Sequence, residues 1–506
     1  MSTTNPVQLQ ESSPAKACSD LPEGWALPRI GEVLEVKYGK GLKKNNRISG
    51  PVPVYGSNGI VGEHNTSLTE GPAIILGRKG TVGAVHFSNT PCWAIDTTYY
   101  IDDFNGLVPE YLLCALKILN LAGLDTSTAI PGLNRNDLYN RHIPLPPIAE
   151  QKRIVAKVEQ LLARVNVARE RLAKVPEILK RFRQSVLAAA CSGRLTADWR
   201  NENSNLEAAA RLIKRIFTKR EEQFKEGVKK IPKKPARLRP RKVEVKDLPE
   251  IPEQWAWVYL PDLGYMSRGK SRHRPRNAPH LYGGPYPFIQ TGDIARCGGR
   301  ITSHQQTYSE EGLAQSRLWT VGTVCITIAA NIASSAILTY PACFPDSVVG
   351  VNPDVNLCLP EYLEFFIRTA QADLDQFAPA TAQKNINVAI LNDVVVPLPP
   401  FAEQQEIVRR VNSLFKLADA IDNRVEVASV RAEKLIQSIL AKAFRGELVP
   451  NEAELARREG RDYEPASVLL ECIKAERETI RKERRPKKQI VSRRRSHRKL
   501  AKATAT

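Results

Sequence analysis

Two long stretches of the chain carry apolar residues at alternating intervals of four and three, which places them along one side of a helix. They follow the prolines of PLPPIAEQ, beginning at Pro144, and of PLPPFAEQ, beginning at Pro397. The apolar positions of the first are Ile154, Val158, Leu161, Val165, Ala168, Leu172, Val175, Leu179, Phe182 and Val186. Those of the second, in the same register, are Ile407, Val411, Leu414, Ala418, Ile421, Val425, Ala428, Ala432, Leu435 and Ile439. Two matched seams of this spacing predict a coiled coil formed within one chain, with a kink at Pro176.

Short apolar runs punctuated by glycine and proline fill the region between Trp25 and Arg141. The runs VPVYGSNGIVG, PAIILGRKGTVGAVHF and CWAIDTTYYI are rich in β-branched and aromatic residues, which predicts strands joined by turns. A helix is predicted at PEYLLCALKIL. The second half of the chain repeats this order with PYPFIQTGDI, GTVCITIAANIASSAIL and PEYLEFFIRTA. The pattern therefore predicts two α+β domains, each ending in a PEYL helix.

The sequence is duplicated internally. The two PLPP motifs lie 253 positions apart, whereas LPEGWAL around Trp25 and IPEQWAW around Trp255 lie 230 apart, so the second copy contains extra residues. The order domain, helix, domain, helix favours antiparallel helices and an approximate two-fold axis within one chain. The predicted fold is two tandem α+β target-binding domains separated by two long helices in an antiparallel coiled coil. The expected divisions are a disordered 1–21, domain 22–143, helical region 144–228, basic linker 229–251, domain 252–396, helical region 397–480 and basic tail 481–506.

Positive charge is concentrated in two segments. The 506 residues carry a net charge of +20, and all but one unit of it lies in Lys229–Lys246 and Arg477–Lys502. Both segments are poor in large apolar residues, which predicts a mobile linker and a mobile tail. Two interpretations stay open: contact with nucleic-acid phosphates without sequence preference, or a contribution to solubility alone.

Cysteine usage and hydropathy exclude several classes of protein. The nine cysteines include no CxxC pair and no Cys/His group at zinc spacing, which predicts a reduced protein without a structural metal. No apolar run reaches the roughly 18 residues of a membrane span. The first residues lack the charged start and apolar stretch of a signal peptide. We therefore expect a cytoplasmic protein without a membrane partner.

A basic loop recurs at the same place in both copies with a different sequence. Residues 37–47 (KYGKGLKKNNR) and 267–277 (SRGKSRHRPRN) each hold five basic residues and no acid. Arginine and asparagine pair with guanine and adenine edges, whereas lysine mostly neutralises phosphate. The pattern predicts loops that contact two different double-stranded DNA sequences; ordinary solvated turns are the alternative. The candidate DNA-binding residues are Lys40, Lys43, Lys44, Asn45, Asn46, Arg47, Arg78, Lys79, Arg268, Lys270, Arg272, Arg274, Arg276 and Gln290.

One motif suggests a competing function. GYMSRGKS, from Gly264 to Ser271, matches the phosphate-loop formula GxxxxGK[ST], which would make the chain a nucleotide hydrolase acting through Lys270. That motif needs a preceding strand and a following helix, and Pro261, Pro275 and Pro279 argue against both. No methyltransferase, metal-nuclease or triad motif is found, which argues against a single-chain restriction–methylation enzyme. A structural scaffold is the third possibility, and we expect no catalytic centre.

The motifs together resemble those of the specificity (S) subunits of type I restriction–modification systems. LPEGW/IPEQW, GRKGTVG, WAIDTT, TGDI and GTVCITIA resemble the target-recognition domains of that family. The two PLPPxAEQ helices, which end in SVLAAACSGRL and SILAKAFRGEL, resemble its two shared helical regions. The similarity runs from residue 22 to about 480 in the order of the family, and the basic tail departs from it.

The resemblance implies a function without chemistry in this chain. Each recognition domain would bind one half of a bipartite, asymmetric DNA sequence. The helical regions would space the two domains and dock two modification subunits, which resemble adenine methyltransferases. Restriction subunits with translocase and nuclease activity would join that core. The resemblance implies no cofactor in this chain; S-adenosylmethionine, ATP and Mg²⁺ are expected on the partner subunits.

Overall fold

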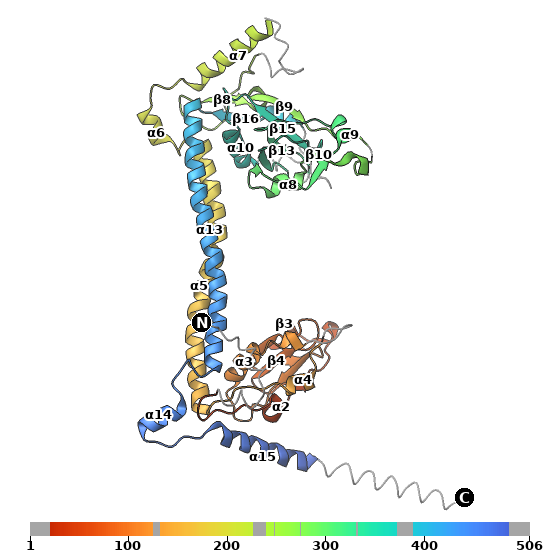
Figure 1. The fold of residues 1–506 in the computed structure, drawn as a ribbon, viewed down its shortest axis with the longest axis vertical. Coiled ribbons are helices and arrows are strands. Elements are labelled where there is room, and N and C mark those ends of the chain that lie inside the picture. The colour runs from red at the N-terminus through yellow and green to blue at the C-terminus, as the bar shows by residue number, and fades with distance from the viewer. Residues whose placement is uncertain are drawn as a thin grey trace, which may run out of the picture. The chain divides into compact units, whose positions relative to one another are not determined.

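The computed structural model describes residues 21–124, 132–225, 239–246, 248–273, 275–329, 332–371 and 388–484. The chain forms two compact units: Met1–Ala173 with Val427–Thr506, called unit 1, and Lys174–Glu426, called unit 2. Each unit holds one α+β domain together with a part of each long helix, α5 (Ile148–Cys191) and α13 (Phe401–Phe444) (Figure 1). The two predicted domains and the pair of long helices are confirmed.

The domain of unit 1 is built around a four-stranded sheet in the order β1-β7-β4-β5. It also contains a three-stranded sheet in the order β3-β2-β6. The central strand β4 is buried at all five residues, as its AIILG sequence requires. The elements are α2 (Ile30–Val33), β1 (Lys37–Tyr38), η2 (Lys44–Asn46), β2 (Val52–Gly56), β3 (Gly59–His64), β4 (Ala73–Gly77), β5 (Val85–Ser88), β6 (Trp93–Ala94), β7 (Thr98–Ile101), α3 (Pro109–Ile118), η3 (Leu121–Leu124) and α4 (Arg135–Tyr139).

The domain of unit 2 has a five-stranded sheet in the order β11-β14-β13-β15-β9 and two small sheets, β10-β12 and β16-β8. Its elements are β8 (Ala256–Tyr259), η4 (Leu260–Asp262), β9 (Gly264–Arg268), η5 (Pro279–Leu281), β10 (Tyr282–Phe288), α8 (Thr291–Arg296), β11 (Arg300–Ile301), β12 (Gln306–Tyr308), α9 (Glu310–Ala314), β13 (Val324–Thr327), β14 (Ser335–Leu338), β15 (Val348–Pro353), α10 (Pro360–Thr369), α12 (Val388–Asp393) and β16 (Val395–Leu398).

The two main sheets have the same core. The order β1-β7-β4-β5 of unit 1 corresponds to β9-β15-β13-β14 of unit 2, to which β11 adds a fifth strand. What differs is the segment between the edge strand and the central strand. In unit 1 that segment carries η2, β2 and β3; in unit 2 it carries η5, β10, α8, β11, β12 and α9. Most of the extra residues of the second copy therefore lie in an insertion that leaves the four shared strands unchanged and adds β11 at one edge.

The long helices pack against each other in both units. In unit 1, Ile154, Val158 and Val165 of α5 share a buried cluster with Ala432 and Ile439 of α13. In unit 2 the buried residues include Val186, Ile407 and Val411. Of the other spacer residues, Leu161 and Leu414 pack as half-buried side chains against these clusters, and Leu172 and Val425 are half-buried. The seam predicted from the sequence is thus largely confirmed.

The helix pair is antiparallel. Arg169 pairs with Glu433 in unit 1 at 3.8 Å, whereas Arg183, further along α5, pairs in unit 2 with Asp419 at 2.8 Å, earlier on α13. Two seam positions are wrong: Ala168 is exposed, and Leu435 is 48% exposed while its neighbour Ile436 packs into the cluster. Helix α5 continues through Pro176. Among the described residues, no helix is both long and apolar enough to cross a membrane.

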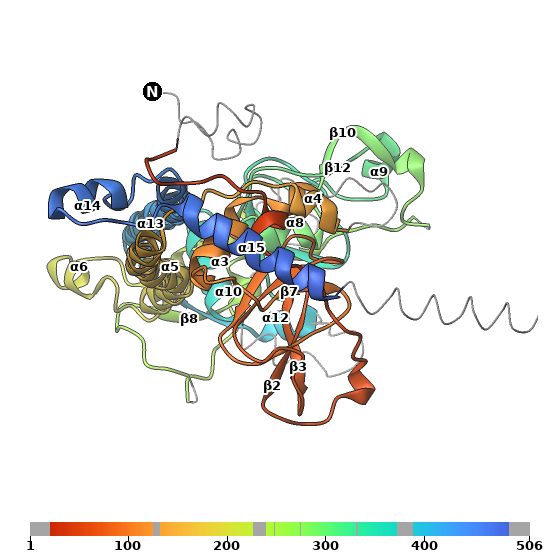
Figure 2. The same cartoon turned by 90° about the horizontal axis from the view of Figure 1, so that it is seen from below.

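Each long helix is followed by a short and a longer helix. In unit 2 these are α6 (Ala197–Glu202) and α7 (Ala209–Lys225); in unit 1 they are α14 (Glu452–Glu459) and α15 (Ala466–Arg484). Figure 2 shows α15 lying across α2. The first amide of each longer helix donates to the turn before the repeated tryptophan, Trp25 or Trp255. Ala209 donates to the Gln254 carbonyl and Ala466 to the Gly24 carbonyl, both at 2.9 Å. The helix that follows one domain along the chain therefore packs on the other domain.

Parts of the two basic segments are ordered, which corrects the prediction for them. Residues 477–484 belong to α15, and the Arg477 side chain donates to the Gly31 carbonyl at 3.1 Å. In the linker, Arg241 lies 3.5 Å from the centre of the Tyr259 ring and pairs with Asp393 at 3.1 Å. Residues 226–238 and 485–506 lie outside the described residues.

Candidate nucleic-acid interface

In unit 1, the start of α5 is hydrogen-bonded to its own domain. The Gln151 side chain accepts from the Val108 amide, which precedes α3, at 3.1 Å and donates to the Pro146 carbonyl at 2.9 Å. The hydroxyl of the fully buried Tyr111 donates to the Pro144 carbonyl at 2.7 Å. Burial raises the pKa of this phenol well above its usual value, so it remains a donor. These contacts explain why PEYL and PLPPxAEQ occur together: one binds the backbone of the other.

Unit 2 repeats the same contacts. Gln404 accepts from the Leu359 amide at 2.9 Å and donates to the Pro399 carbonyl at 3.1 Å, and the Tyr362 hydroxyl donates to the Pro397 carbonyl. These proline carbonyls precede the long helices and lie outside their hydrogen-bond pattern, and buried carbonyls need donors. Each domain is therefore attached to the first turn of the long helix that follows it.

A buried glutamate links each domain to the segment that follows the other long helix. In unit 1, Glu150 accepts from the Trp25 indole at 3.1 Å and from the Glu452 amide at 2.9 Å. Burial raises the pKa of the Glu150 carboxyl. In unit 2, Glu403 accepts from the Trp255 indole at 2.8 Å and pairs with Arg200 at 2.7 Å. Sequence reasoning used these tryptophans only to mark the duplication.

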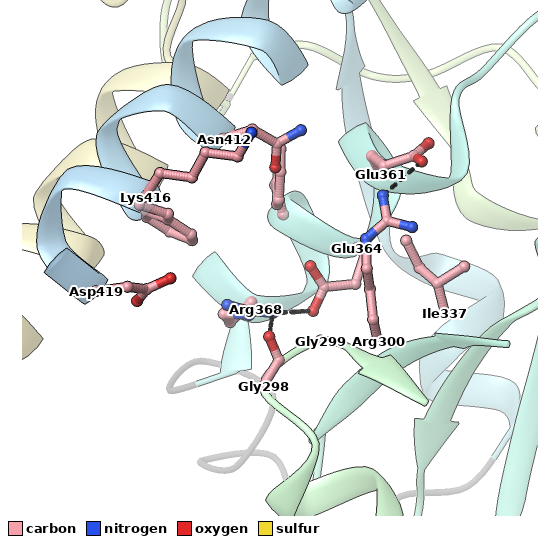
Figure 3. Close-up of a pocket in the computed structure, with 12 residues that line it drawn as sticks. Gly298, Gly299, Arg300, Ile337, Glu361, Glu364, Arg368, Asn412, Lys416 and Asp419 are labelled. Carbon is pink, nitrogen blue, oxygen red and sulfur yellow. Dashed lines mark hydrogen bonds and ion pairs between the residues drawn. The ribbon is translucent and has the colours of Figure 1, made fainter. Parts of the chain in front are cut away.

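The two domains meet α5 and α13 differently. In unit 2 a pocket of about 420 Å³ lies between α10, β11 and α13 (Figure 3). The carboxyl of Glu364 at its edge is 1% exposed, accepts from Arg368 at 2.6 Å, and has its pKa raised by burial. The residue of α3 that corresponds to Glu364 is Leu113, which packs against the core of unit 1. The charged junction therefore belongs to the second domain.

The predicted basic loop of unit 1 follows the edge strand β1. Lys43, Lys44, Asn45 and Asn46 are exposed in and beside η2, where solvent surrounds their side chains. Arg47 instead folds back and donates to the Val61 carbonyl at 2.7 Å. The first four residues are therefore available to a ligand, whereas Arg47 holds the loop against β3.

Lys40 and the residues after β4 lie next to the same edge strand. Lys40 is exposed, and its ammonium lies 5.9 Å from the centre of the Trp93 ring, whose indole donates to the Lys40 carbonyl at 2.8 Å. Both β1 and β4 pair with β7, which brings Arg78, directly after β4, over the ring of Tyr38 at 5.1 Å. Lys79 is exposed. The structure thus places Lys40 and Arg78 close to the edge strand β1, whereas Lys43 to Asn46 lie in and beside η2.

In unit 2 several of the predicted residues have partners within the protein. Arg268 donates to the Asp346 carbonyl at 2.9 Å, and Arg276 pairs with the Asp346 carboxylate at 2.9 Å. Arg272 is exposed, while its amide is held by the side chain of Gln315. Arg274 lies outside the described residues. Gln290 stands apart in the insertion, at the start of α8, where it donates to Gln306 at 2.6 Å.

The phosphate-loop motif does not form a phosphate cradle. Gly264–Arg268 is strand β9, which pairs with β15 along its whole length. Lys270 is half-buried, its carbonyl accepts from Ser316, and the Ser271 side chain is buried 3.5 Å from the Tyr308 hydroxyl. Of the described residues after Ser271, the first in a helical turn are Pro279–Leu281, well beyond the motif. A nucleotide hydrolase acting through Lys270 is thereby disfavoured, since its helix N-terminus is missing. No group of three or more His, Cys, Asp or Glu among the described positions is arranged to hold a metal.

The duplicated fold has a counterpart among known families. The family model for the type I restriction modification DNA specificity domain matches twice, over residues 22–177 and 252–427. The chain belongs to this family. It is similar to the type I restriction enzyme EcoDI specificity subunit of Escherichia coli, with 28% identity over 467 residues that cover 90% of this chain and 96% of that one. With the StySPI specificity subunit of Salmonella potsdam the identity is 31% over 495 residues, again 90% and 96%.

A solved chain shares the fold. It comes from work on complex assembly and conformational transition of the type I restriction–modification system, with a TM-score of 0.61 and 20% identity over 84% of this chain and 99% of that one. The protein is therefore a type I DNA specificity subunit, the non-catalytic member of its family. The sequence predicted this family from the same duplicated motifs.

Proposed function

We propose that this specificity subunit binds a bipartite, asymmetric DNA sequence, with the domain at 22–143 contacting one half and the domain at 252–396 the other. The observation that carries the proposal is the pair of domains with one core sheet and two different insertions. A shared core keeps each domain attached to its helix in the same way. Different loops beside the edge strand give the two domains different contacts with base edges, which carry sequence information.

We further propose that α5 and α13 set the gap between the half-sites and dock two modification subunits. Each helix has 44 residues, or roughly 66 Å at 1.5 Å per residue. Large apolar side chains are exposed along both helices outside the seam, where a docked subunit would bury them. They are Val167 and Ile178 on α5 and Leu417, Val427, Val430 and Leu435 on α13.

The remaining chemistry belongs to the partners in this proposal. The modification subunits would carry S-adenosylmethionine, and restriction subunits would use ATP and Mg²⁺. The candidate residues of this chain would contact double-stranded DNA in the cytoplasm, the lysines chiefly at phosphates. The spacing of the two half-sites would then be a property of this chain alone.

Selection of bound duplexes from a randomised DNA library by the full-length protein, alone and with its modification subunits, tests the proposal. The expected result is one motif of two short, unlike blocks separated by a fixed number of unspecified base pairs. Binding without any base preference would overturn the proposal. A single uninterrupted block would show that only one domain contacts bases.

A matched insertion tests the role of the helices. Arg169 faces Glu433 in the antiparallel pair, so Ala163 of α5 lies near Ile439 of α13. Four residues inserted at both places add roughly 6 Å, nearly two base pairs, and rotate each helix by little more than one turn. We expect the gap to lengthen by one or two base pairs while both blocks keep their sequences. A changed block with an unchanged gap would show that the helices do not set the spacing.

A further inference from the structure

Two guanidinium groups lie over the ring of one exposed tyrosine in unit 1. The central carbons of Arg78 and Arg135 are 5.1 and 4.9 Å from the centre of the Tyr38 ring. Arg78 follows strand β4 and Arg135 is the first residue of α4, so two separate segments supply them. The Tyr38 side chain is 50% exposed, so the group faces solvent.

The group rests on a rigid base. Tyr99, 2% exposed, packs edge-on against Tyr38 with ring centres 5.0 Å apart, and its hydroxyl donates to the Leu133 carbonyl at 3.0 Å. Arg78 donates one hydrogen bond to the Asp96 carbonyl at 3.1 Å. Stacking on an aromatic ring fixes the plane of a guanidinium, so less side-chain freedom is lost when it binds a ligand.

The positive charge of this group is unbalanced. Among the described residues, no carboxylate lies within ion-pair distance of Arg78 or Arg135, in contrast to Arg276 of unit 2, which pairs with Asp346. Two like charges on one ring repel each other, and a ligand that accepts hydrogen bonds would relieve that repulsion. The side chains are therefore held ready for an acceptor that the described part of the protein does not supply.

The corresponding described positions of the second domain do not carry this group. The register of β1 on β7 and of β9 on β15 makes Arg268 the counterpart of Tyr38. The residue after β13, the counterpart of Arg78, is Ile328, which is 3% exposed, and α12 begins with Val388 where α4 begins with Arg135. A group present in one domain and absent from the other is suited to a contact that distinguishes two half-sites.

We propose that Arg78 and Arg135, stacked on Tyr38, contact the major-groove edge of guanine in the half-site bound by the first domain. An oriented guanidinium donates two hydrogen bonds to guanine O6 and N7, a pattern no other base offers. Among the described residues, Lys43 and Lys44 have no such aromatic contact, and they act at phosphates. This inference rests on the proposed function and adds to it a base, its half-site and a residue, Arg135, that the sequence did not indicate.

The experiment repeats the library selection with the full-length protein and three substitutions: Arg135→Lys, Arg78→Lys and Tyr38→Leu. The lysine substitutions keep the positive charge but remove the bidentate hydrogen-bond donor. The leucine substitution removes the aromatic ring. We expect each variant to relax the preference for a guanine in one block by roughly five- to 150-fold, with the other block unchanged. Tyr38→Phe keeps the ring and should keep the preference; Lys43→Ala should weaken binding to all sequences equally.

The outcomes separate this inference from the proposed function. If the unsubstituted protein selects a two-block motif and all three variants select the same motif, Arg78 and Arg135 are not base contacts. The inference is equally overturned if the variants lose affinity for every sequence alike, because that is the result of a lost phosphate contact. If the unsubstituted protein selects no motif, it is the proposed function that fails. Circular dichroism and the thermal midpoint establish whether each variant is folded.

Discussion

The two units are alike where they bind their own helices and unlike where they face a ligand. Gln151 and Gln404 make the same hydrogen bonds to a PEYL helix and a proline carbonyl, and the core sheets have one order. Beside the edge strands the insertions differ: Arg78 and Arg135 lie over Tyr38 in the first domain, whereas Asp346 binds Arg276 in the second. The residues that attach each domain to its long helix are separate from those in the loops beside the edge strand. The loops can therefore change without disturbing the helices.

The buried glutamates Glu150 and Glu403 occupy equivalent positions in the two units but bind different partners. Glu403 binds the guanidinium of Arg200, itself only 16% exposed, whereas Glu150 binds two neutral N–H groups. We expect Glu403→Gln to destabilise unit 2 by about 3 kcal/mol or more, because it leaves a charge buried without its partner. Glu150→Gln should cost unit 1 only about 1 kcal/mol, since burial already raises the pKa of that carboxyl.

Hydrogen exchange in α6 and α14 reports the two effects separately, since each helix belongs to one unit. Faster exchange in α6 for Glu403→Gln, with α14 unchanged, is the expected result. Equal losses for the two substitutions would show that the two junctions are energetically equivalent, and the difference in their partners would have no consequence.

The turn after the central strand gives a second contrast. Gly83 and Ala333 occupy it in units 1 and 2, with φ of +75° and +56°, and their amides donate to Gly77 and Thr327. A Cβ on Gly83 would lie 2.4 Å from the Ala122 nitrogen. Gly83→Ala should therefore cost about 2–3 kcal/mol. Ala333→Gly should change stability by less than about 1 kcal/mol, because relief of the left-handed backbone offsets the lost methyl group.

Thermal unfolding of the two variants measures this difference directly. A large loss in Ala333→Gly would mean that the buried methyl group outweighs the backbone term. A small loss in Gly83→Ala would mean that η3 moves away at little cost, and the close approach of the two segments would not be required.

The smallest predicted effect concerns the arginines of unit 2. Asp346→Asn removes the carboxylate that binds Arg276. We expect DNA affinity to rise by up to about tenfold and the slope of log affinity against log salt to steepen by about 0.9, the value for one phosphate contact. Stability should fall by less than about 1 kcal/mol, because the pair is exposed to solvent.

Asp422→Asn is the matched control. It removes the same charge from α13, where Asp422 pairs with Arg183 at 3.0 Å. An equal rise in affinity for the control would show an effect of net charge alone. An unchanged salt slope for Asp346→Asn would show that Arg276 does not contact DNA.

Periodic features could be predicted from the sequence and distant contacts could not. The seams, the PEYL helices and the duplication follow from local spacing, so the fold class and the family were accessible. The sequence could not show that Ile436 rather than Leu435 occupies the seam. Both residues are apolar, and only their packing distinguishes them. Among the candidate DNA residues, the pairing of Arg276 with Asp346 could not be predicted, since 70 positions separate them. Arg135 was missed because nothing local distinguishes it from a solvated helix residue.

The division of the chain among the two units has a consequence for synthesis. Unit 2 is a continuous segment, Lys174–Glu426, whereas unit 1 combines the first 173 residues with the residues from Val427 onward. At about 5–20 residues per second, the 253 residues between the two parts of unit 1 take roughly 13 to 50 s to translate. The first domain to leave the ribosome is therefore the last to be completed. During that interval α15 has not yet bound the surface around Gly24 and Gly31. That surface is accessible to chaperones and to other chains.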